Sequence, residues 1–152
     1  MKNENLNSIA FSATLHCLTG CALGEVLGLM IGTALGLSTI ATIILAISLA
    51  FLFGYLFSLV PLVRSGLALK SAVPVVLAAD TLSIATMEVA DNTVMAIIPG
   101  AMNAGLVNPL FWIGMIIALF VAFWAAYPVN RYLLSKNKGH ALTMNHHEGH
   151  MA

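Results

Sequence analysis

The sequence predicts an all-α fold, an integral membrane four-helix bundle with short loops. Of the 152 residues, 60% are apolar and only 8% are charged, and the mean hydropathy is +0.96. A soluble domain of this size could not bury so much apolar surface. A helix needs roughly 20 mostly apolar residues to cross a bilayer. The chain has four such stretches, at about 9–36, 38–61, 73–98 and 109–130, so we expect one four-span domain over residues 1–134.

Residues that end or start helices separate the four spans. Leu37-Ser38-Thr39 offers a capping hydroxyl, and Pro61 is expected to close the second span. Pro74 falls in the first turn of the third span, where a missing N–H does no harm. Pro99-Gly100 should end that span, and Asn108-Pro109 should open the fourth. Short connections make consecutive helices antiparallel neighbours.

The basic residues predict the orientation in the membrane. With four spans, both termini and the second connection lie on one side, and the first and third connections contain no lysine or arginine. The charged side carries all six basic residues: Lys2, Arg64, Lys70, Arg131, Lys136 and Lys138. The positive-inside rule therefore predicts a multi-pass protein of the bacterial inner membrane with both termini in the cytoplasm.

Several function classes are excluded by charge and motif content. The net charge is zero with neutral histidines, and basic residues scattered along one membrane face do not indicate nucleic-acid binding. No phosphate-binding loop, dinucleotide fingerprint or HExxH motif occurs. Nothing identifies the base and oxyanion site that a cysteine nucleophile needs. We therefore expect no enzymatic activity, and as partners the lipid bilayer together with further copies of this chain or a larger membrane complex.

Polar and sulfur-containing side chains interrupt the first and third spans. Residues four apart lie on one face of a helix. Cys17, Cys21 and Glu25 therefore form a stripe along the first span, and His16 lies next to it. Both spans run outward from the cytoplasm, which places Cys17 and Asp80 at equal depth, about 12 Å at 1.5 Å per residue. The candidate residues at matching levels of the two spans are His16, Cys17, Cys21, Glu25, Asp80, Met87, Glu88, Asp91 and Met95.

These side chains favour a site for a soft or borderline metal ion, copper or zinc. Ionisable groups are costly in a bilayer, and no lysine or arginine lies at their depth, so a cation, a proton or water must compensate. The structural alternatives are that the cysteines are small apolar fillers and that some carboxyls only bond neighbouring helices. The leading hypothesis is a protein that binds this metal ion between the first and third spans. Transport of the same ion across the membrane extends this hypothesis. The alternatives are a non-catalytic subunit or assembly factor of a larger complex, and a proton-coupled transporter of a small solute.

Glycine recurs at every fourth residue of the first span and makes a smooth ridge. Small residues at this spacing let another helix approach closely, whether that helix belongs to this chain or to another subunit. Four helices enclose at most a narrow site, so the ridge also favours a homo-oligomer. Its members are Gly20, Gly24, Gly28, Gly32 and Gly36.

The C-terminal segment 135–152 is polar and without apolar periodicity, which predicts a disordered cytoplasmic tail. Histidine-rich tracts bind metal ions, so this tail is a candidate for metal capture at the cytoplasmic mouth. A solvated tail with incidental histidines is the alternative. The residues concerned are His140, His146, His147 and His150.

The chain resembles a family of bacterial membrane proteins known as domain of unknown function 4396. The motifs that carry the resemblance are LHCLTGCALGEVLGLMIGTALG, LAADTLSIATMEVADN, IPGAMNAG, YPVNR and KGHA, and they extend over about 130 residues. The resemblance implies a compact multi-span domain and supplies no activity or substrate. It marks these pattern positions: His16, Cys17, Cys21, Glu25, Asp80, Glu88, Asp91, Asn92, Pro99, Gly100, Asn130 and Arg131.

Overall fold

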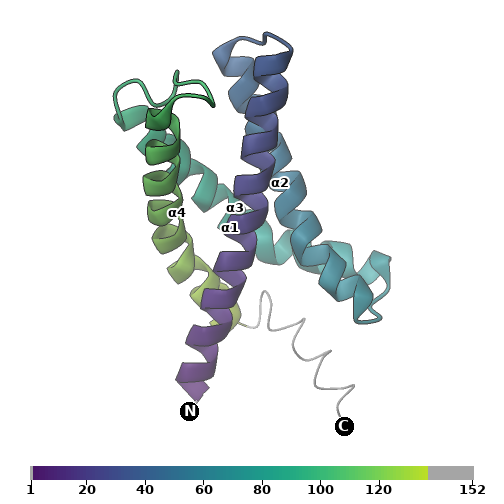
Figure 1. Cartoon of the computed structure of the whole chain (residues 1–152). Coiled ribbons are helices and arrows are strands. Elements are labelled where there is room, and N and C mark those ends of the chain that lie inside the picture. The colour runs from purple at the N-terminus through teal and green to yellow at the C-terminus, as the bar shows by residue number, and fades with distance from the viewer. Residues whose placement is uncertain (1, 137–152) are drawn as a thin grey trace.

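Four long helices that alternate in direction make up most of the chain (Figure 1). The computed structural model describes residues 2–136. The helices are α1 (Lys2–Ala34), α2 (Thr39–Arg64), α3 (Leu69–Ile97) and α4 (Pro109–Ser135), and residues 2–136 contain no strand. Each helix is long and apolar enough to cross a membrane. The predicted all-α, four-helix membrane fold is confirmed.

Local chemistry sets the ends of the helices. Gly36 follows α1 with φ at 64°, a left-handed conformation that glycine adopts without steric cost. Ser38 caps α2 by accepting a hydrogen bond from the Ala41 amide at 3.3 Å. The expectation that Pro61 closes this helix was wrong, since α2 continues to Arg64. A proline removes one donor, but its carbonyl still accepts, here from the Ser65 amide at 2.9 Å, and membrane helices tolerate such prolines.

Both ends of the described chain lie at the same end of the molecule (Figure 1). The connection between α2 and α3 lies at this end too, whereas the α1–α2 and α3–α4 connections lie at the opposite end. The described basic residues whose side chains can be placed are all close to the first end: Arg64, Lys70, Arg131 and Lys136.

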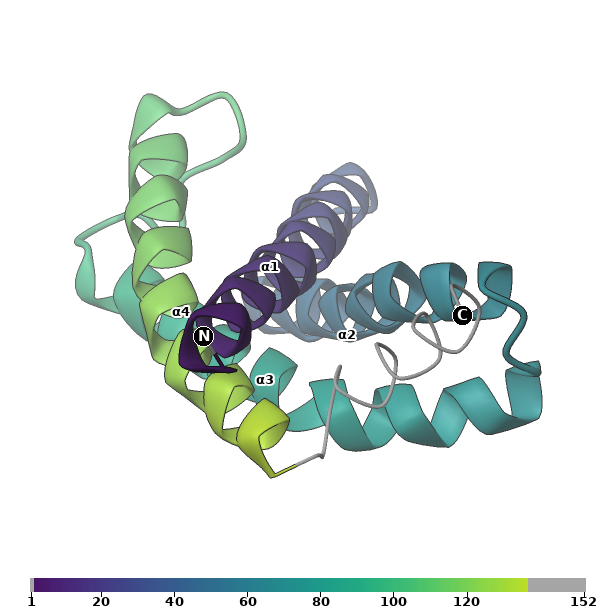
Figure 2. The same cartoon turned by 90° about the horizontal axis from the view of Figure 1, so that it is seen from below.

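Helix α1 lies between α2 and α4 (Figure 2). The most extensive packing is within the pairs α1–α2 and α3–α4, and the pairs are joined through α1–α4, α2–α3 and α1–α3 contacts. Large apolar side chains cover the outside, among them Ile40 and Ile44 of α2. Such an apolar exterior is suited to contact with lipid.

The glycine ridge of α1 packs against α2 of the same chain. A Cβ at Gly20 would lie 3.0 Å from the Gly54 Cα, and at Gly24 or Gly28 it would overlap the α2 backbone. Gly32 packs in the same way on the Thr42 side chain. Gly36 has no atom within 4 Å of a built Cβ, so it ends the helix instead of packing in the ridge. The ridge is occupied within the chain and does not offer a face to a second copy.

Candidate functional site

Three acidic side chains from two helices meet inside the bundle. Glu25 of α1 is 8% exposed, and Glu88 and Asp91 of α3 are 5% and 3% exposed. The Glu25 carboxyl lies within hydrogen-bonding reach of the Asp91 carboxyl, and Glu88 is near enough to both to interact electrostatically. Residues three apart share a helix face, so α3 presents both of its acids to α1. We call Glu25, Glu88 and Asp91 the acidic group.

The acidic group has more hydrogen-bond acceptors than donors. The Glu88 Oε2 and both Asp91 oxygens are buried and receive no hydrogen bond from the described residues when the groups are ionised. A carboxylate can only accept, but one proton between Glu25 and Asp91 turns their contact into a hydrogen bond. A buried acceptor without a donor costs about 1–3 kcal/mol. The described lysines and arginines lie near helix ends, so a proton, water or another cation has to supply the missing donors.

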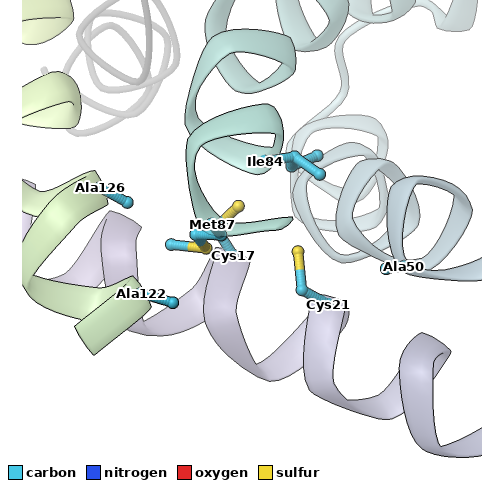
Figure 3. Close-up of a cluster of buried hydrophobic side chains, with 7 residues drawn as sticks. All are labelled: Cys17, Cys21, Ala50, Ile84, Met87, Ala122 and Ala126. Atoms are coloured by element: carbon cyan, nitrogen blue, oxygen red, sulfur yellow. The ribbon is translucent and has the colours of Figure 1, made fainter. Parts of the chain in front are cut away.

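A buried sulfur cluster, formed by Cys17 and Cys21 of α1 and Met87 of α3, lies inside the bundle (Figure 3). Cys17 and Cys21 are free thiols in mutual contact, and Met87 packs with them. The Ser83 hydroxyl donates to the Cys17 Sγ at 3.9 Å. Glu25 and Glu88 both influence Cys21 electrostatically, so the two groups are neighbours. The remaining cluster residues are apolar and come from the other helices as well: Ala50, Ile84, Ala122 and Ala126.

Three other residues expected at the site are not members of these two groups. His16 is exposed, and its Nε2–H donates to the Phe57 carbonyl of α2 at 2.8 Å. Its ring also packs edge-on against the Phe57 ring, with centroids 5.6 Å apart. Met95 belongs to a second apolar cluster with residues of α4. Asp80 is buried on α3, about two turns before Met87.

The described residues do not form the single metal site that the sequence favoured between the first and third spans. In residues 2–136, no group of three or more His, Cys, Asp and Glu side chains is placed so that it could hold a metal ion. His16 is held against α2 by its bond to the Phe57 carbonyl, whereas the Cys17 Sγ accepts from Ser83 of α3, so these two neighbours along the chain point to different helices. The tail histidines, His140, His146, His147 and His150, lie outside the described residues.

A cavity leads from one end of the molecule to the acidic group. Its volume is about 360 Å³, and it lies between α1, α2, α3 and the α3–α4 connection. Glu25 forms its deep end, about 16 Å along α1 from Gly36 at the mouth. The polar side chains that line it are Thr33, Thr39, Thr42, Asn92 and Asn103. Its apolar lining includes Leu29, Ile43, Met95, Met102 and Phe111. Glu25 is therefore the member of the acidic group that the cavity reaches from the end that carries the α1–α2 and α3–α4 connections.

Two structural features were not predicted from the sequence. Thr14 accepts a hydrogen bond from the Asn130 side chain at 2.9 Å, which joins α1 to α4 inside the bundle. The cavity-lining threonines and Asn103 were also missed. A threonine in a helix commonly bonds its own backbone, as Thr14 does to the Ala10 carbonyl at 2.7 Å. The cavity-lining threonines could therefore not be told apart in the sequence from ordinary helix hydroxyls, whereas Asn130 is a position that the family resemblance marks.

The fold and the site define a class, a four-span membrane protein with an acidic interior reached from one end. The chain belongs to the family described as Domain of unknown function (DUF4396), whose family model matches residues 7–139. The resemblance drawn from the sequence motifs is thus confirmed. No curated protein and no solved structure matches the chain.

Proposed function

We propose that this protein is a proton-coupled transporter of a small solute in the bacterial inner membrane, with Glu25 and Asp91 as the proton-exchange site. One observation carries the proposal: the buried carboxyl of Glu25 lines a cavity open at one end and is in contact with the buried carboxyl of Asp91 from another helix. Ionisable groups held at such depth are expensive, and in transporters they mark proton or ion pathways.

The carboxyl pair supplies a coupling between proton and solute. With one shared proton, Glu25 and Asp91 form a hydrogen bond; when that proton leaves, two like charges are left in contact. The repulsion can be relieved if a cation enters the cavity or if α1 moves away from α3. A solute bound at the same carboxyls would therefore exchange with the proton.

The direction of access follows from the basic residues. The end that carries Arg64, Lys70, Arg131 and Lys136 is opposite the cavity mouth. If the positive-inside rule holds for this chain, both termini are cytoplasmic and the cavity opens outward.

Carbodiimide labelling tests the proton-exchange site. Carbodiimides modify protonated carboxyls in apolar surroundings, so Glu25 should be labelled in the membrane-embedded protein, as read by peptide mass spectrometry. Vesicles that contain the wild-type chain and are loaded with a small ammonium solute such as butylammonium should take up protons faster than empty vesicles when they are diluted into solute-free buffer, and Glu25→Gln or Asp91→Asn should abolish this difference. Wild-type vesicles that match empty vesicles would overturn the proposal.

A copper or zinc site is the second candidate function, favoured by the meeting of Cys17, Cys21 and Met87. Two thiolates and a thioether are ligands that suit copper(I). The test is elemental analysis of purified protein after metal loading under reducing conditions. The comparison variants are Cys17→Ser/Cys21→Ser and a chain truncated after Lys138. Metal held by the truncated core and lost from the cysteine variant supports this site, whereas no bound metal in any sample contradicts it.

A further inference from the structure

The cavity above Glu25 has the size of a small-molecule site. Its volume is about 360 Å³, within the range of about 300–1,000 Å³ that is usual for ligand pockets. A bare metal ion would fill little of this space, whereas roughly a dozen water molecules at ~30 Å³ each would fit. The cavity therefore suits an organic molecule of a few carbon atoms.

The charge distribution around the cavity favours a cation. Glu25 lines its deep end, and no lysine, arginine or histidine is among the residues that line it. Asp91 is in contact with Glu25, is 3% exposed and does not line the cavity, but its carboxyl adds to the negative charge at this end. An anion would be repelled here, and a neutral hydrocarbon would leave the Glu25 carboxylate without a counter-charge. An ammonium nitrogen supplies the Glu25 carboxylate with N–H donors and a positive charge.

The walls indicate an apolar body on that cation. Leu29 of α1, Ile43 of α2 and Phe111 of α4 line the same cavity. An alkyl chain placed against these side chains gains the usual hydrophobic contribution from removing apolar surface from water. Hydroxyls and amides are found towards the mouth, where Thr33, Thr39 and Asn103 are exposed.

We propose that this cavity binds a small organic cation of the alkylammonium class, with its nitrogen at Glu25 and its alkyl part against Leu29, Ile43 and Phe111. The inference rests on the proposed function and names the class of solute that the transporter would exchange for a proton.

Calorimetric titration of the detergent-solubilised full chain with butylammonium tests the inference, with empty micelles as the blank. The wild type should bind butylammonium and should not bind 1-butanol, its neutral analogue, at the same concentration. Glu25→Gln should weaken binding by roughly tenfold to hundredfold, because one charged hydrogen bond is lost. Equal binding of 1-butanol, or unchanged binding in Glu25→Gln, would overturn the inference.

A second pair of variants tests the site without touching the acidic group. Thr33→Trp should obstruct the mouth and weaken butylammonium binding at least tenfold. Leu35→Trp places the same bulk on a side chain that is 69% exposed and lies outside the cavity lining, so it should bind like the wild type. Equal affinities of the two variants would contradict the inference. Binding of butylammonium by a chain that moves no protons would leave the cation site standing and overturn only the proton-coupled transporter.

Discussion

At the scale of single residues, the contact between Glu25 and Asp91 is unfavourable unless it holds a proton. An amide in place of one carboxyl supplies an NH₂ donor at nearly the same shape and volume. Substitution of one carboxyl by an amide therefore removes a contact between like charges and also gives a buried acceptor a hydrogen-bond donor. Residues of this kind, which cost stability where they stand, are typical of functional sites.

Asp91→Asn should stabilise the protein and abolish proton uptake. We expect a gain of about 1 kcal/mol, the size of one satisfied buried acceptor. The measurement is the unfolding free energy in detergent, set beside the vesicle assay. Thr93→Ala is the control, since Thr93 is exposed on the same helix and its hydroxyl bonds only the Val89 carbonyl. A destabilised Asp91→Asn chain would show that the carboxylate has a structural partner.

The hydrogen bond between Thr14 and Asn130 should show measurable coupling between α1 and α4. A double-mutant cycle of Thr14→Val and Asn130→Leu isolates this pair. The expected coupling is about 0.6 kcal/mol, the average for such bonds in membrane proteins, with roughly 1.7 kcal/mol as an upper bound. Strictly additive effects on the unfolding free energy would mean that the bond contributes nothing.

At the scale of the helices, the close contact of α1 with α2 depends on the absence of Cβ atoms. Two effects of a Gly→Ala substitution compete there. Alanine raises helix propensity by about 1 kcal/mol, whereas overpacking costs typically about 1–3 kcal/mol. At Gly28 the obstructing atoms include the Ala46 backbone, which cannot rotate away as a flexible side chain would. Overpacking therefore outweighs propensity at this position.

A Cβ at Gly28 would lie only 2.4 Å from the Ala46 Cα, so overpacking should cost about 3 kcal/mol, and Gly28→Ala should lower the unfolding free energy by about 2 kcal/mol net. Gly105→Ala is the matched control, because a Cβ there meets nothing within 4 Å and φ is not positive. Gly36→Ala also has open space, but at φ of 64° it should cost about 1–2 kcal/mol through backbone strain. Thermal unfolding in one detergent compares all three. An unaffected Gly28→Ala chain would contradict the packing argument.

The spans and their depths could be predicted by counting, but the rotation of each helix could not. Glu25, Glu88 and Asp91 meet because α1 and α3 run in the same direction and carry their acids at similar depths. His16 is one residue before Cys17, about 100° around the helix at 3.6 residues per turn, and it faces α2 instead. Helices that are apolar on most sides give no strong preferred face. Which neighbour a given side chain meets was therefore decided by packing, above all by the glycines that bind α1 to α2.

At the scale of the whole molecule, the arrangement of the connections predicts from which side of the membrane a cysteine in each connection can be labelled. Val107 in the α3–α4 connection and Ala68 in the α2–α3 connection are exposed at opposite ends. In a Cys17→Ala/Cys21→Ala background, a membrane-impermeant maleimide should label Val107→Cys from outside the cell. Ala68→Cys should be labelled only in inverted vesicles. The reverse pattern would mean that the basic end faces outward and that the cavity opens to the cytoplasm.

The close packing of α1 against α2 makes this helix pair one of two parts of the molecule. Where two backbones touch without side chains between them, sliding or tilting is opposed by hard overlap, so these two helices behave as one rigid half. Helices α3 and α4 form the other half. Glu25 belongs to the first half, and Glu88 and Asp91 belong to the second. The three carboxyls therefore face one another across the boundary between the two helix pairs. Under the proposed function, gain or loss of one proton between Glu25 and Asp91 would strengthen or weaken the contact between these two helix pairs, which the Thr14–Asn130 bond also joins.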